Sequence, residues 1–134
     1  MGVRAVPRGL LLLLVMLVQA SDFAEGLPTV NIDDYDRIAS DLLKRAHEIE
    51  TEKRPAYTLG DEDVLKNFRS VGARLKLTPE QTWGVLFLKH VDACTAIMLY
   101  PDMPVAESPL ERFADTINYL KLGFALLAER DAPQ

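Results

Sequence analysis

The chain has 134 residues, enough for one domain of ordinary size, which excludes a barrel of eight βα units or a two-domain dehydrogenase. Hydrophobic residues make up 49% and charged residues 26%, a globular balance that argues against disorder throughout. The net charge of -5 leaves no basic surplus, so general nucleic-acid binding is not expected. The single cysteine, Cys94, excludes an internal disulfide and a cysteine-rich zinc site.

Residues 1–20 have the composition of a secretory signal peptide. Arg4 and Arg8 precede an apolar run over residues 9–18, and small residues follow at the spacing that signal peptidase requires. The run is shorter than the ~20 residues of a membrane-spanning helix, so membrane contact is expected only through an uncleaved leader. Two interpretations stay open: an exported protein, or a misassigned start codon and a cytoplasmic protein.

Residues 21–32 are predicted to be a linker into a helical domain. A first helix is expected to begin at Asp33 or Asp34, because carboxylates suit a helix N-terminus. Pro55 is expected to end it, because proline removes a donor and restricts the residue before it. Apolar residues recur at steps of three or four along one face: Tyr35, Ile38, Leu42, Ala46 and Ile49.

A second helix is predicted after Asp61, which can cap it, with Gly72 near its end. The run Thr78-Pro79-Glu80-Gln81 predicts the start of a third helix that extends to about Leu99. This helix is apolar over most of its circumference, so we expect it to be the central and most buried one. Cys94 is then a buried small apolar residue.

Ser108-Pro109-Leu110-Glu111 repeats the start signature for a fourth helix, which extends to about Leu127 before a tail at residues 130–134. No stretch alternates with a period of two for long enough to predict a strand. The sequence therefore predicts an all-α domain over residues 33–129, a compact bundle of about four helices.

The fourth helix carries the strongest candidate site. Glu111, Asp115 and Asn118 lie on one face, and two carboxylates with an amide can hold an oxygen-liking cation such as Mg²⁺. Glu111 and Asp115 are the candidate catalytic residues, because the ion would bind phosphate oxygens and activate water. In the alternative interpretation Glu111 is a capping residue, Asp115 a first-turn charge and Asn118 a surface polar residue.

Charged residues also interrupt the apolar third helix. Asp92 is a candidate third metal ligand and Lys89, three residues earlier, a candidate phosphate contact. In the alternative interpretation, both residues lie at the solvent-exposed rim of the bundle.

Lys53 is a second candidate phosphate contact. Tyr57, expected in the loop after the first helix, is a candidate to stack on a base or to plug the end of the bundle.

No P-loop, dinucleotide glycine motif or G-x-S-x-G motif is present. Without a glycine cradle, phosphates can be held only by a metal ion and basic side chains. Any nucleotide chemistry is thereby narrowed to a metal-carboxylate type.

Several short motifs resemble a family of small helical proteins that are common in bacteriophages and prophages. The resemblance covers residues 33–128. It lies in Lys53-Arg54-Pro55-Ala56-Tyr57, Asp63-Val64-Leu65-Lys66-Asn67-Phe68, Leu77-Thr78-Pro79-Glu80-Gln81, Leu88-Lys89-His90-Val91-Asp92-Ala93, Glu107-Ser108-Pro109 and Asp115-Thr116-Ile117-Asn118-Tyr119-Leu120.

That family is in turn similar to the MazG-type all-α nucleotide pyrophosphohydrolases, which hold Mg²⁺ with acidic residues from neighbouring helices. The resemblance implies that Glu111 and Asp115, with Asp92, form one half of a metal site. Glu48 and Glu52 of the first helix would supply the other half. Asn118, Tyr57, Lys53 and Lys89 become substrate-binding candidates.

We therefore expect a phage-type helical protein that is nucleotide-binding or a Mg²⁺-dependent nucleoside triphosphate pyrophosphohydrolase. Self-association is expected as well, because the resembling enzymes build sites between subunits. The alternatives are a non-enzymatic helical interaction module and an exported helical domain.

Overall fold

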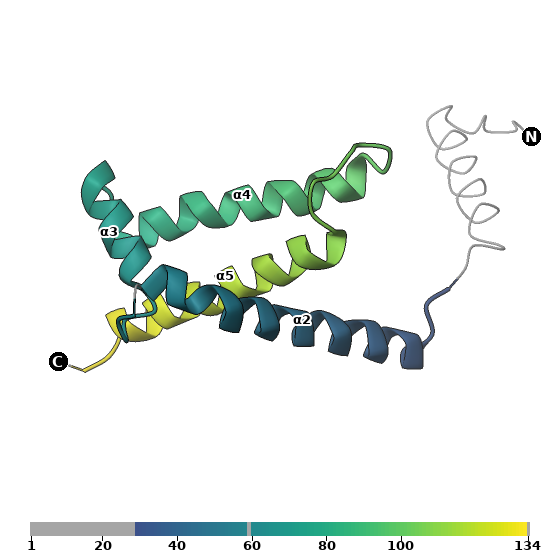
Figure 1. Ribbon diagram of the computed structural model, residues 1–134, viewed down its shortest axis with the longest axis horizontal. Coiled ribbons are helices and arrows are strands. Elements are labelled where there is room, and N and C mark those ends of the chain that lie inside the picture. The colour runs from purple at the N-terminus through teal and green to yellow at the C-terminus, as the bar shows by residue number, and fades with distance from the viewer. Residues whose placement is uncertain (1–28, 59, 134) are drawn as a thin grey trace, which may run out of the picture. The chain divides into compact units, whose positions relative to one another are not determined.

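The computed structural model describes residues 29–58 and 60–133, which form four α-helices and no strand (Figure 1). The chain divides into two units, residues 1–35 and 36–134, and only residues 29–35 of the first are described. The predicted leader lies outside the described residues. The all-α class is confirmed by the helices α2 (Ile32–Thr58), α3 (Lys66–Leu75), α4 (Pro79–Leu99) and α5 (Pro109–Arg130).

The two predicted proline-containing helix starts are confirmed. At α4, the Thr78 hydroxyl accepts from the Gln81 amide at 3.1 Å, and the Gln81 side chain accepts from the Thr78 amide at 2.9 Å. At α5, the Ser108 hydroxyl accepts from the Glu111 amide at 3.2 Å. These bonds satisfy amides that have no partner inside the helix, which fixes both starts locally.

The end of α2 corrects a prediction. Pro55 does not end the helix, which continues through it to Thr58. Pro55 removes only one donor, close to the C-terminus of the helix. Because Thr58 is buried, its packing compensates for that loss. Tyr57 consequently lies in the last turn of α2 and not in a loop.

The start of α3 corrects a second prediction. The helix begins at Lys66, several residues beyond Asp61, and Asp61 therefore does not cap it. The Asp63 carboxylate accepts from the amide of Leu65 at 2.9 Å, which holds a turn before the helix. Leu65 is buried, so packing positions the first turn without a side-chain cap.

Helix α5 is the central helix of the described bundle. One core cluster joins α2 to α5 through Ala46, Ile49 and Ala114. A second cluster joins α3 and its preceding turn to α5 through Leu65, Phe68 and Leu126, with Trp83 of α4 packed against it.

The prediction that residues 79–99 form the most buried helix is wrong. Only Thr82 and Cys94 of α4 are buried, as expected for Cys94. Val85 and Leu88 remain 60% and 59% exposed. Its length and composition alone would allow α4 to cross a membrane. A helix that is apolar on most of its faces is buried only where other helices pack against it, and the sequence of the helix does not show where they pack.

Helices α4 and α5 approach each other closely at one point. The Trp83 indole donates to the Tyr119 carbonyl at 2.7 Å, and a Cβ atom on Gly123 would lie 2.5 Å from the Trp83 ring. Only glycine fits under the indole. This crossing places Tyr119 beside the C-terminal half of α2, where the candidate site lies.

Candidate functional site

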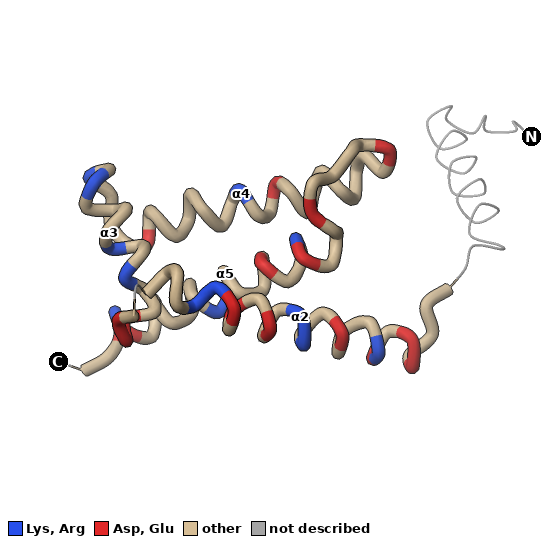
Figure 2. Tube along the Cα trace, in the orientation of Figure 1, with Lys and Arg blue, Asp and Glu red and all other residues tan. Residues whose placement is uncertain are grey.

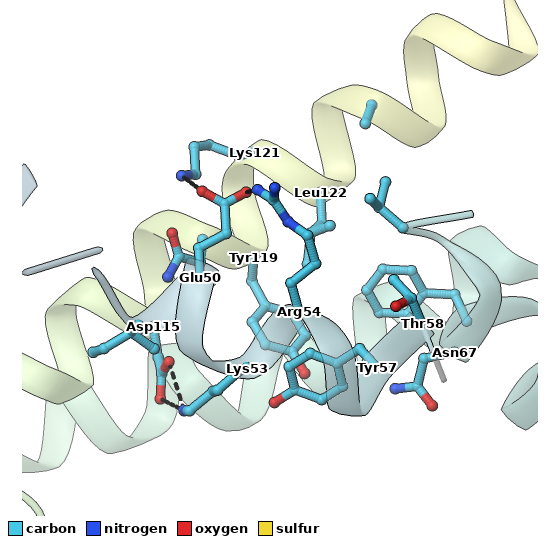
Figure 3. A pocket seen from close by; sticks show the side chains of 15 residues that line it. Glu50, Lys53, Arg54, Tyr57, Thr58, Asn67, Asp115, Tyr119, Lys121 and Leu122 are labelled. Carbon is cyan, nitrogen blue, oxygen red and sulfur yellow. Dashed lines mark hydrogen bonds and ion pairs between the residues drawn. The ribbon is translucent and has the colours of Figure 1, made fainter. Parts of the chain in front are cut away.

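A cavity of about 160 Å³ lies between the C-terminal half of α2, α3 and α5, and we call it the α2–α5 cavity (Figure 3). Its apolar wall comes from all three helices and the turn before α3. Its polar groups come from the last turns of α2 and the middle of α5, with Asn67 from α3. The lining residues are Ile49, Glu50, Lys53, Arg54, Tyr57, Thr58, Val64, Asn67, Phe68, Asp115, Asn118, Tyr119, Lys121, Leu122 and Ala125.

One ion pair joins α2 to α5 at this cavity. The Lys53 ammonium lies 3.0 Å from Oδ1 and 3.1 Å from Oδ2 of Asp115 (Figure 3). The Asp115 side chain is only 11% exposed, whereas that of Lys53 is 45% exposed. Lys53 therefore neutralises a largely desolvated carboxylate while one side of its ammonium stays open to solvent.

A second ionic group lies on the same cavity. Glu50 accepts from Lys121 at 2.5 Å and lies 3.4 Å from the guanidinium of Arg54 (Figure 3). The hydrogen bond from Lys121 holds the pKa of Glu50 below its usual range. With Lys53 and Asp115, the cavity lining carries three cations and two carboxylates, so the site has a positive excess.

Aromatic rings form much of the apolar wall. Phe68 and Tyr119 meet edge to face with centroids 6.1 Å apart. Burial raises the pKa of Tyr119 to about 12, so its phenol stays protonated at neutral pH. Tyr57 is 43% exposed at the rim, so it is accessible to a ligand that stacks on its ring.

Asn118 has an unused acceptor. Its amide nitrogen donates to the Ala46 carbonyl at 2.8 Å, which fixes the orientation of the side chain across α2 and α5. Its Oδ1 is buried and accepts no hydrogen bond from any described residue. Buried acceptors are normally paired with protein or with ordered water, and no described residue supplies a donor to this one.

The structure brings together four of the predicted site residues: Lys53, Tyr57, Asp115 and Asn118 all line the cavity. Lys89 does not; it is exposed on α4 and is not a lining residue.

The cavity also contains residues that sequence reasoning did not propose as ligand contacts, namely Glu50, Arg54, Asn67 and Lys121. The i,i+4 spacing of Glu50 and Arg54 could have indicated their pairing. Nothing local in the sequence indicates that Lys121 reaches across to α2.

The predicted metal ligands Asp92, Glu111 and Asp115 are not gathered around one point. In the described ranges, 29–58 and 60–133, no three His, Cys, Asp or Glu side chains are placed to hold a metal ion. Asp92 is exposed on α4, and Asp115 faces Lys53. The magnesium site therefore stays a prediction.

Glu111 belongs to a separate acidic group around Arg45. The Arg45 guanidinium lies 2.9 Å from Glu111, 3.3 Å from Glu48 and 3.8 Å from Glu52. Acidic side chains of α2 and α5 are therefore near each other here, with the Arg45 side chain between their carboxylates. The hydrogen bond from Arg45 lowers the pKa of Glu111.

Comparison with known proteins gives no match to a protein-family model, to a curated protein or to a solved structure.

Proposed function

We propose that this chain is a helical nucleotide-binding protein whose ligand occupies the α2–α5 cavity. The observation that carries the proposal is the buried Oδ1 of Asn118, an acceptor that no described residue satisfies, on a residue that lines a cavity with an apolar wall and a positive rim. An exocyclic amine of a nucleobase is a donor of the required kind.

The distribution of polarity fits a molecule with one flat end and one anionic end. The enclosed space suits a base or a sugar more than an entire nucleotide, since pockets for drug-sized ligands are typically about 300–1,000 Å³. The phosphates would lie at the mouth, where the side chains of Lys53, Arg54 and Lys121 are 45–51% exposed. Tyr57 would stack on the base from the rim.

Hydrolysis is the stronger form of this proposal and stays a prediction from the family resemblance. Asp115 is the one predicted catalytic carboxylate on the cavity, and it faces Lys53. Binding of Mg²⁺ at Asp115 would require Lys53 to turn toward the phosphates. A phage origin likewise remains part of the proposal.

The test is a binding titration of the full chain with adenine, guanine, cytosine and thymine nucleotides. Calorimetry and NMR chemical shifts measure the binding. Arg54→Ala and Tyr57→Ala should each weaken binding, because each removes a proposed contact with the ligand. Both residues are at least two-fifths exposed, so the two substitutions should leave the core intact. Arg74→Ala, an exposed cation on α3 outside the cavity, is the matched control and should bind as the wild type does.

Binding that is absent at millimolar nucleotide, or that Arg74→Ala weakens as much as Arg54→Ala does, would remove the proposal. Turnover is measured separately, by release of pyrophosphate with and without Mg²⁺. A ligand that binds without turnover supports the binding function alone.

A further inference from the structure

Two cations at the mouth of the α2–α5 cavity share one carboxylate. Lys121 of α5 donates to one oxygen of Glu50 at 2.5 Å, and the guanidinium of Arg54 lies 3.4 Å from the other oxygen (Figure 3). We call Glu50, Arg54 and Lys121 the Glu50 triad. Since two cations face one carboxylate, the triad has an excess of one positive charge.

The second ionic group on the cavity, the Lys53–Asp115 pair, adds no net charge. Lys53 contacts both carboxylate oxygens of Asp115, whose side chain is only 11% exposed. If Lys53 turned to a ligand instead, it would leave a desolvated carboxylate without its cation, which is strongly unfavourable. The positive charge available to an anionic ligand therefore lies in the Glu50 triad.

Arg54 has the most donors open to such a ligand. Its distance of 3.4 Å from Glu50 is longer than a charge-assisted hydrogen bond of about 2.7–2.9 Å. Glu50 is its only ionic partner in residues 29–58 and 60–133, and half of the Arg54 side chain is exposed. A guanidinium presents several N–H donors in a planar fork that matches two oxygens of a phosphoryl group.

A longer phosphate chain would find no further positive charge on the cavity. Lys53, Arg54 and Lys121 are the only cations among the described residues that line it. The chain as a whole has 20 acidic and 15 basic residues, and Figure 2 shows both charges following one another along α2. The Glu50 triad is thus a small positive region on an acidic protein.

Given the proposed function, on which this step rests, we propose that the ligand is a nucleoside monophosphate whose phosphoryl group binds between Arg54 of α2 and Lys121 of α5. A phosphate monoester carries a charge of about −1.5 to −2 at neutral pH, which the triad largely offsets. The cavity of about 160 Å³ receives the nucleoside, and the phosphoryl group stays at the mouth. Glu50 limits the positive charge there and so disfavours di- and triphosphates.

The first experiment titrates the full chain, by calorimetry, with adenosine and cytidine and with their mono-, di- and triphosphates. Each titration is run without divalent cations and again with Mg²⁺. The monophosphate of one series should bind about tenfold or more tightly than its nucleoside, and at least as tightly as its triphosphate. Inorganic phosphate alone should bind more weakly than the monophosphate, because it makes no contact inside the cavity.

The second experiment uses variants of the triad. Arg54→Ala should reduce the ratio of monophosphate to nucleoside affinity about tenfold, and Lys121→Ala should reduce it in the same direction. Glu50→Gln should raise affinity for the triphosphate about threefold or more relative to the monophosphate, because it removes the competing negative charge. A purely structural role of Glu50 predicts no such gain.

Arg74→Ala, which removes an exposed cation of α3 outside the cavity, is the matched control and should leave all these ratios unchanged. Circular dichroism confirms that each variant remains folded. Because Glu50→Gln keeps the size and hydrogen-bonding capacity of the side chain, it tests the proposal even if one of the alanine variants unfolds.

Three results overturn the monophosphate assignment while the proposed function stands. They are a triphosphate that binds the wild type more tightly than the monophosphate, with or without Mg²⁺; a nucleoside that binds as tightly as its monophosphate; and triad variants that change no ratio. Inorganic phosphate that binds as tightly as the monophosphate would show an anion site without nucleoside recognition. If neither nucleosides nor nucleotides bind, the proposed function and the monophosphate assignment both fail.

Discussion

The ammonium of Lys53 lies within 3.1 Å of both carboxylate oxygens of Asp115, 62 residues away in sequence, and ties the end of α2 to the centre of α5. Asp115 is buried and Lys53 is half exposed, so loss of its partner costs Asp115 more stability than it costs Lys53. Removing the lysine leaves a desolvated negative charge, whereas removing both charges leaves none. This asymmetry yields the first prediction.

Lys53→Met should lower the free energy of unfolding by about 1–2 kcal/mol, a figure reduced from that of a fully buried pair because Lys53 contacts solvent. Adding Asp115→Asn should recover part of that loss, since the amide carries no charge. Urea denaturation of both single variants and the double variant measures the coupling. Strictly additive losses would show that the two groups do not interact.

Gly123→Ala should destabilise the protein by about 1–3 kcal/mol, because the new methyl group would lie 2.5 Å from the Trp83 ring. Gly84→Ala is the matched control on the facing helix, where a Cβ atom would meet nothing within 4 Å. That substitution should stabilise α4 by about 0.5–1 kcal/mol. Thermal denaturation of the two variants checks the difference; equal effects would contradict the close helix crossing.

Protonation of His90 should destabilise the fold. Burial lowers the pKa of His90 below its ordinary value of 6.5, although Asp115 opposes the shift. The unfolded chain then binds a proton before the folded chain does, so stability present above about pH 6.5 is lost as the pH falls toward the folded pKa. Glu50 and Glu111 have lowered pKa values, so their ion pairs stabilise the fold until the pH falls below about 4.5.

The measurement is the denaturation midpoint between pH 7.5 and pH 5. The wild type should lose stability over this range, and His90→Gln should show a flatter profile, because glutamine does not titrate. Identical slopes for the two proteins would exclude His90 as the cause.

Magnesium alone should leave the melting temperature of the wild type unchanged at constant ionic strength, because Arg45 and Lys53 already neutralise Glu111 and Asp115. Arg45→Met removes the cation between Glu48, Glu52 and Glu111, so Mg²⁺ should stabilise this variant more than the wild type. A saturable rise for the wild type that Asp115→Asn abolishes would instead support the predicted magnesium site.

Local sequence determined much of the helical framework. The starts at Thr78-Pro79 and Ser108-Pro109 were predictable because a capping bond is made within four residues. The continuation of α2 through Pro55 was not, because burial of Thr58 depends on residues distant in sequence.

The sequence by itself determined an all-α chain and proposed Lys53, Tyr57, Asp115 and Asn118 as site residues. Only the tertiary structure decided which neighbours these residues have. It placed Lys53 on Asp115 and Arg45 among the carboxylates around Glu111, and it left one face of α4 exposed. The physical reason is range: capping and helical periodicity act within one or two turns, whereas ion pairing and burial depend on how whole helices cross.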